Sequence, residues 1–275
     1  MRFCPRFATI LVLLVVTALL SPTSLSAATL GSLQEKLNTA ISPGNADTRV
    51  PAAKAVTEGW QDSLPVLIQN ISTYYQSDGK SYSHETIAKL LPLTDLLVSI
   101  VETKDGAIEK FREVDTSETV DVLTLAAASD DRDLRLNASS VLYKVVDDDN
   151  LCIVFHRLRD PKLGSSGQLN LLQIAVWGAN TAARENLQAA KETVEKLKAS
   201  AEENPNQTSG DGDRALYVNT LDSLASGRER MAKPLPPNSY CARYNVDTGV
   251  AVRSESVAVP SETPAATPPP AAPSP

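Results

Sequence analysis

Two cysteines and two histidines are the residues of this sequence whose types and spacing best suit metal or redox chemistry. Cys152 and His156 are four positions apart and would share one face of a helix, where two such ligands make half of a zinc site. Cys241 and His84 remain to complete that site with sulfur or nitrogen. Cys152 and Cys241 can instead form a disulfide or stay as free thiols, so the four residues alone leave three alternatives open.

Other sequence motifs typical of catalysis or ion binding do not occur. The acidic runs at 130–131, 147–149 and 211–213 lack the alternating oxygen ligands and the distal acid of a calcium loop. The Gly-Ser-Ser-Gly segment at 164–167 lacks the spacing of a nucleophile elbow, and Gly-x-x-x-x-Gly-Lys does not occur. We therefore predict no catalytic residue, no metal and no cofactor, and a protein that is not an enzyme.

The first 28 residues have the order of a secretory signal peptide. Arg2 and Arg6 precede an apolar run at 8–20, and the small residues 26–28 follow. That run is shorter than the roughly 20 residues needed to cross a bilayer, so we expect cleavage, export to the periplasm or the medium, and no stable membrane insertion afterwards. Cleavage removes Cys4 and leaves two cysteines in an oxidising compartment, which favours a Cys152–Cys241 disulfide.

The composition limits the classes of partner and of fold that fit this sequence. The chain has 275 residues with 33 acidic and 26 basic side chains, a net charge of −7, so we expect no binding to nucleic acid. Aromatic residues make up 5%, which is low for a sandwich or barrel. Apolar residues recur every three or four positions at 30–41, 59–73, 83–102, 116–128, 133–146, 166–180 and 213–231, and 182–203 has a strongly helix-forming composition.

These patterns predict an all-α protein in four parts. A signal peptide at 1–28 precedes a helical repeat domain at 29–232, and a C-terminal extension at 233–259 docks on that domain. The last segment, 260–275, has seven prolines in 16 residues and should be disordered. Pro92 should kink or break the helix at 83–102.

Two segments share one pattern, Asp-x-Arg-x-x-Ala-x-x-x-apolar. They read 47-DTRVPAAKAV-56 and 133-DLRLNASSVL-142, and in each the aspartate should cap a helix while the alanine allows a neighbouring helix to approach. This pattern resembles the second helix of HEAT and armadillo-like repeats. The resemblance implies a short α-solenoid of helix pairs, with an irregular helical bundle as the alternative. It also implies that the motif residues are framework: Asp47, Arg49, Ala52, Asp133, Arg135, Ala138 and Leu142.

The remaining candidate for recognition is a polar loop that interrupts the helical rhythm. Tyr74, Tyr75 and Tyr82 lie in it, and loop tyrosines are common contact residues, although they can also fill the edge of a helix pair. Helical solenoids usually bind proteins or peptides. We therefore expect an exported interaction module with an unknown protein or peptide partner. The alternatives are a cell-envelope enzyme with unidentified acidic residues and a structural envelope factor.

Overall fold

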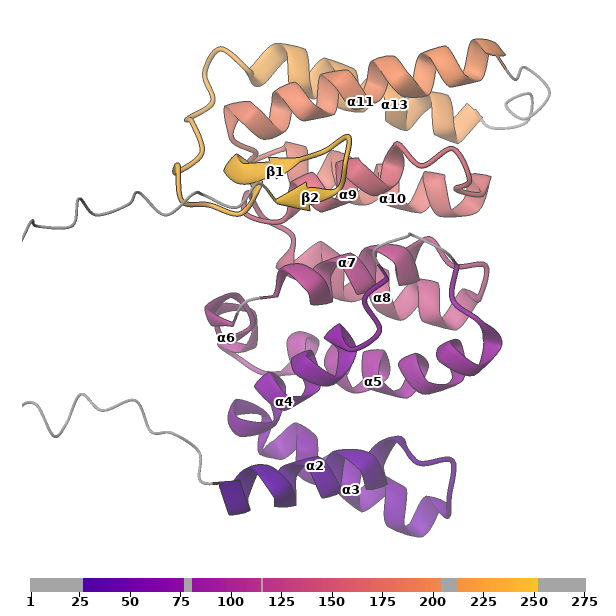
Figure 1. Cartoon of the computed structure of the whole chain (residues 1–275), viewed down its shortest axis with the longest axis vertical. Helices are drawn as coiled ribbons and strands as arrows, with labels where there is room; N and C mark the ends of the chain where they lie inside the picture. The colour runs from indigo at the N-terminus through magenta and orange to yellow at the C-terminus, as the bar shows by residue number, and fades with distance from the viewer. Residues whose placement is uncertain (1–26, 77–80, 115, 204–211, 252–275) are drawn as a thin grey trace, which may run out of the picture. The chain divides into compact units, whose positions relative to one another are not determined.

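The computed structural model describes residues 27–76, 81–114, 116–203 and 212–251 (Figure 1). Within these ranges the chain is all-α, as predicted, with eleven α-helices, one 3-10 turn and one hairpin of two-residue strands. The signal peptide predicted at 1–28 overlaps the described residues only at the start of the first helix. The proline-rich segment at 260–275 lies outside them.

The helices follow the predicted ranges closely, because buried apolar residues recur at the spacing of one helix face. Two outcomes differ from expectation: the seven-residue α6 was not predicted, and α5 continues through Pro92 without a break. The helices are α2 Ala27–Ile41, α3 Ala46–Glu58, α4 Trp60–Ser72, α5 His84–Thr103, α6 Ala107–Glu113, α7 Ser117–Ala127, α8 Arg132–Val145, α9 Leu151–Leu158, α10 Ser165–Ala179, α11 Arg184–Glu203 and α13 Gly212–Arg228.

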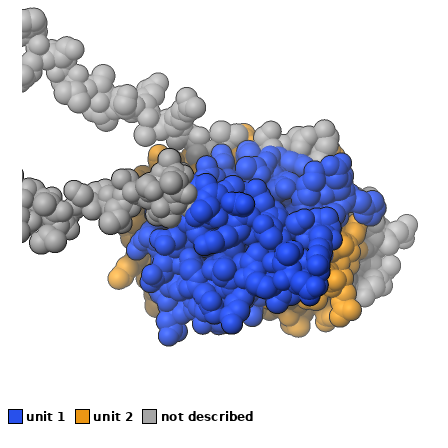
Figure 2. Space-filling model, turned by 90° about the horizontal axis from the view of Figure 1, so that it is seen from below, with its two compact units in different colours: residues 1–77, 82–122 blue, residues 78–81, 123–275 orange. Residues whose placement is uncertain are grey.

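The chain divides into two compact units (Figure 2). Unit 1 comprises residues 1–77 and 82–122, and unit 2 comprises residues 78–81 and 123–275. The range predicted as one repeat domain, 29–232, is therefore shared between two units.

Unit 1 is built around α4 and α5. α2 packs against α3, and α4 packs against α5 and α6. The core consists of side chains with at most 2% of their surface exposed, among them Leu64, Leu67, Ile71, Leu90, Leu97, Ile100 and Phe111.

Unit 2 is organised around α10, which contacts α8, α9, α11 and α13. A Cβ atom added at Gly178 would lie 2.7 Å from the Cδ1 atom of Leu151, so the absence of a side chain at 178 lets α10 approach α9 closely. Beyond α13 the chain forms the 3-10 turn Cys241–Arg243. Strands β1 (Tyr244–Asn245) and β2 (Val250–Ala251) then pair antiparallel.

The two motif copies occupy equivalent helix positions but not equivalent surroundings. The predicted caps are wrong: Asn45 caps α3 and Asp131 caps α8, so Asp47 and Asp133 each lie two residues further along. Both aspartates remain in the first helical turn, where a negative charge is favourable.

The arginines and alanines of the two copies differ in burial. Arg135 donates from Nη1 to the carbonyl oxygen of Ser129 at 2.7 Å, beyond the end of α7, whereas Arg49 is exposed. Ala138 and Leu142 are fully buried, and Ala52 is only half-buried. The second copy is therefore packed along its length, whereas the first is buried at Val56 and largely exposed elsewhere.

Candidate functional site

Unit 2 exposes a group of aromatic and apolar side chains, here called the aromatic face. It consists of Tyr143 from α8, Gln173 and Trp177 from α10, and Tyr217 from α13. Trp177 keeps 59% of its surface exposed. Three helices that are distant in the sequence therefore contribute to one surface.

The aromatic face has a defined geometry at its centre. The rings of Tyr143 and Trp177 meet edge to face, with centroids 6.3 Å apart and planes at 88°. The Tyr143 hydroxyl donates to Oε1 of Gln173 at 3.4 Å. Partial burial raises the pKa of Tyr143, and the negative charge of an ionised Tyr217 nearby raises it further. Tyr143 is therefore a neutral hydroxyl at physiological pH.

Packing of α10 explains why Trp177 faces outward. Leu172, Ile174 and Ala175 are fully buried. On the side toward α8, the amide of Asn170 donates to the carbonyl of Ala127 at 2.7 Å and to the hydroxyl of Ser139 at 2.6 Å. These contacts fix the rotation of α10 about its axis, which leaves its remaining apolar side in solvent.

The apolar spacing at 166–180 predicted a helix that includes Trp177 but did not identify this surface. One signal was present: the sequence of α10, SSGQLNLLQIAVWGA, contains no charged residue on any side. Such a helix is either buried all round or exposes an apolar surface. The periodicity alone does not decide between these two outcomes.

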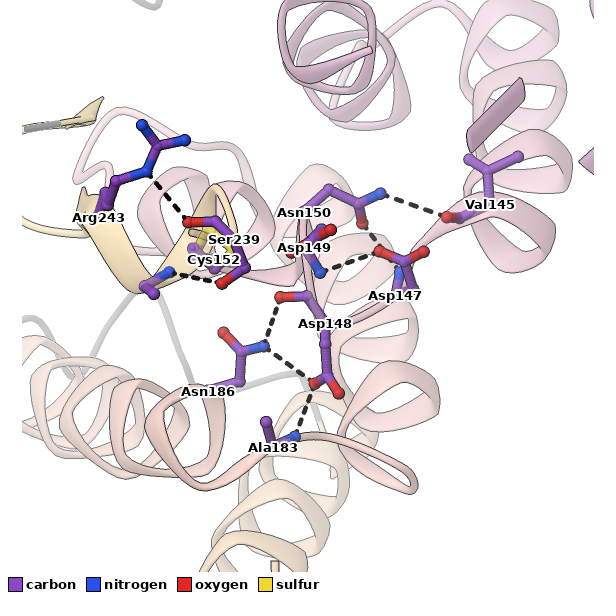
Figure 3. Close-up of a disulfide and its surroundings, with 12 residues drawn as sticks. Val145, Asp147, Asp148, Asp149, Asn150, Cys152, Ala183, Asn186, Ser239 and Arg243 are labelled. Atoms are coloured by element: carbon purple, nitrogen blue, oxygen red, sulfur yellow. Dashed lines mark hydrogen bonds between the residues drawn. A yellow bond between two sulfur atoms is a disulfide. The ribbon is translucent and has the colours of Figure 1, made fainter. Parts of the chain in front are cut away.

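A second candidate region is the C-terminal clip, defined as residues 233–251. It is joined to α9 by the disulfide between Cys152 and Cys241, whose Cα atoms are 5.6 Å apart, as the sequence predicted (Figure 3). His156, one turn after Cys152, contacts the carbonyl oxygen of Val246 through Nδ1 at 2.7 Å. Cysteines bonded to each other are not thiolate ligands, so the zinc alternative does not hold for this pair.

An ion-pair cluster holds the far end of the clip. Asp247 lies 2.5 Å from Nη1 of Arg159 and 2.5 Å from Nζ of Lys196. Hydrogen bonds from these two cations lower the pKa of Asp247. The Arg159 side chain is only 6% exposed, and it also donates to the carbonyl of Ala189 and to Glu192.

A pocket of about 330 Å³ lies between the clip and α11, with Arg159, Asn186 and Gln188 among its lining residues. Arg159 already pairs with Asp247 and Glu192 of the same chain. The charges at this pocket therefore hold the clip against α9 and α11.

The acidic run at 147–149 is also framework. Figure 3 shows that the carboxylates of Asp147 and Asp148 accept from backbone and amide N–H groups. Asp148 accepts from the backbone N–H of Ala183 at 2.6 Å and from Nδ2 of Asn186 at 3.2 Å, so it fixes the start of α11. Across the described ranges, no group of three or more His, Cys, Asp or Glu side chains is placed to hold a metal ion.

The structure places the three tyrosines of the loop in different surroundings. Tyr82 is 8% exposed, and its hydroxyl donates to the carbonyl oxygens of Tyr74 at 3.3 Å and Val122 at 3.4 Å. Tyr82 is therefore a buried anchor rather than a partner contact. Tyr74 is half-buried and Tyr75 is 39% exposed, so these two are the accessible tyrosines of the loop.

No protein-family model matches the chain, and no curated protein or solved structure is significantly similar to it. In the part of the chain that the structure describes, no helix combines the length and apolar character needed to cross a membrane.

Proposed function

We propose that this protein is an exported module that binds a protein or peptide partner through its helical surface, and that the aromatic face makes the contact. The observation that carries the proposal is the exposure of Trp177 beside Tyr143. Tryptophan and tyrosine are enriched among the residues that dominate binding energy in interfaces.

Two features support the proposed compartment and architecture. The signal-peptide pattern at 1–28 and the disulfide of the clip are both typical of exported chains. Support for a HEAT-like solenoid comes from helices that pack in consecutive pairs, α2 with α3 and α4 with α5 in unit 1, and from α10 contacting both α8 and α13 in unit 2.

A peptide-selection experiment tests the binding function. A random peptide library is selected on the immobilised mature chain and on the same chain with the seven prolines of 260–275 replaced by alanine. The enriched peptides are then measured against the parent chain, Trp177→Ala and Val50→Ala. Val50 is 62% exposed and belongs to unit 1, so it is a matched control for loss of exposed apolar surface.

We expect Trp177→Ala to weaken binding by roughly 30-fold or more, the loss typical of a central aromatic contact, and Val50→Ala to leave it unchanged. The proposal is wrong if no peptide is enriched on either form of the chain, or if enriched peptides bind the Trp177 variant as well as its parent. Melting temperatures of both variants establish that a loss of binding is not a loss of folding.

A further inference from the structure

We infer that the aromatic face binds a proline-rich segment, and that in the free protein the chain's own residues 260–275 occupy it. This inference rests on the proposed function, because it names the ligand class of the same face. A partner would then have to displace the segment before binding.

The chemistry of the aromatic face suits proline. Proline-rich peptides dock in aromatic-lined grooves, because their rings pack flat on aromatic rings and their extended backbone has no internal hydrogen bonds. Their carbonyl groups therefore need donors from the partner. The perpendicular rings of Tyr143 and Trp177 provide adjacent flat surfaces, and the indole N–H of Trp177 is a donor in the same place.

The composition of the segment complements this surface. Residues 260–275 contain seven prolines, three of them consecutive at 268–270, with Ala, Ser and Thr between them and a single charge at Glu262. The segment has no large apolar side chain and no basic group. Packing of its prolines on aromatic rings is therefore the strongest interaction that it can offer to a protein surface.

The connection is long enough for the segment to reach the aromatic face of its own molecule. The described chain ends at Ala251 in β2 of unit 2, the unit that contains the face. Residues 252–267 can span up to roughly 55 Å when extended. A compact unit of about 150 residues has a radius of gyration near 15 Å, so the segment can reach the face from any attachment point on the unit. Such tethers give effective concentrations in the millimolar range, at which even a weak contact is populated.

Acrylamide quenching of Trp177 fluorescence tests the inference. The mature chain carries Trp60→Phe so that Trp177 is the only reporter, and it is compared with the same chain in which all seven prolines of 260–275 are replaced by alanine. We expect the replacement to raise the quenching constant of Trp177 at least twofold, and a synthetic 260–275 peptide at millimolar concentration to reverse the change. The matched control carries Trp177→Phe and reports Trp60 of unit 1, whose quenching should not respond to the prolines.

Equal quenching of Trp177 with and without the prolines overturns the inference. Protection that disappears on 100-fold dilution also overturns it, because the occupant would then be the segment of a second copy. If Trp60→Phe perturbs folding, the shift of the Trp177 indole N–H resonance in the otherwise unmodified chain gives the same comparison. Peptide selection on the chain without prolines separates the two proposals. If the segment does not protect Trp177 but selected peptides bind through Trp177, the proposed function holds and only this inference fails. If the segment protects Trp177 but no peptide is selected, only the proposed function is refuted.

Discussion

Removal of the Cys152–Cys241 disulfide should destabilise unit 2 and leave unit 1 unchanged. The bonded cysteines are 89 positions apart. Closing a loop of that length lowers the entropy of the unfolded chain by an amount worth about 4–5 kcal/mol in the chain-entropy model. Both cysteines belong to unit 2. For a unit of about 150 residues, that loss corresponds to a fall in melting temperature of roughly 10–20 °C.

The two tryptophans allow the units to be followed separately. Trp60 lies in α4 of unit 1 and Trp177 in α10 of unit 2, so Trp177→Phe and Trp60→Phe variants each report one unit. Each is unfolded by heat and by urea in the oxidised form, and again after Cys152→Ala and Cys241→Ala are introduced together. Alanine is preferable to serine here, because Cys152 and Cys241 are 1% and 7% exposed and a buried hydroxyl would add its own penalty.

The expected result is a large shift of the Trp177 transition and none of the Trp60 transition. A shift of the Trp177 transition worth less than about 1 kcal/mol would refute the loop-closure reasoning. Equal shifts of both transitions would contradict the assignment of the bond to one independently unfolding unit. Added reductant should not change the alanine double variant, which excludes a direct effect of the reductant.

Four further results are expected. Gly178→Ala should lower the stability of unit 2 to urea by about 1–3 kcal/mol, because the added methyl group meets a leucine side chain, whereas Gly164→Ala, which meets nothing within 4 Å, should not cause this loss. Arg135→Ala should cost about 1–3 kcal/mol in the same assay, because its guanidinium donates to two backbone carbonyls beyond α7. Tyr143 should ionise above the usual pKa of about 10. Alkaline absorbance of wild type against Tyr143→Phe measures this ionisation. The contribution of Tyr143 to stability should be complete below about pH 10 and be lost as the pH rises through its folded-state pKa. Asp247, whose pKa is lowered, should stabilise the clip above about pH 4 and lose that effect as the pH falls through the folded-state value. Hydrogen exchange in the clip should show the loss, and Asp247→Asn should abolish the pH dependence.

Periodicity predicted the helices because the burial pattern repeats with the helix turn. In α5, Leu90, Leu93, Leu97 and Ile100 recur at three- and four-residue spacing, and none is more than 1% exposed. Pro92 misled the prediction. Pro92 lies in the third turn, where proline is normally unfavourable. The helix continues because the chain on either side is held by buried leucines, a tertiary effect that local propensity does not contain.

Capping was harder to predict because neighbouring residues offer the same chemistry. Asp131 and Asp133 both precede an apolar run, and either carboxylate can accept from the free amides of a first turn. The structure selects Asp131, whose carboxylate accepts from the backbone N–H of Leu134 at 2.9 Å. The choice depends on where the preceding chain leaves α7, which the motif does not specify. For the same reason the motif did not predict that Arg135 would be anchored and Arg49 exposed.

The aromatic face depends on the position of α10 among its neighbours. Leu151 of α9 packs against Gly178, the residue directly after Trp177, and Cys152, the next residue of α9, carries the disulfide to the clip. The disulfide and the close α9–α10 contact therefore lie at adjacent residues of α9, and that contact lies directly beside the exposed indole of α10. A surface held in this way loses little conformational freedom when a ligand binds, and preorganisation of this kind increases affinity without any new contact. In the function proposed above, the clip would act indirectly, by holding α9, the helix that packs against α10 beside Trp177, although no residue of the clip belongs to the aromatic face.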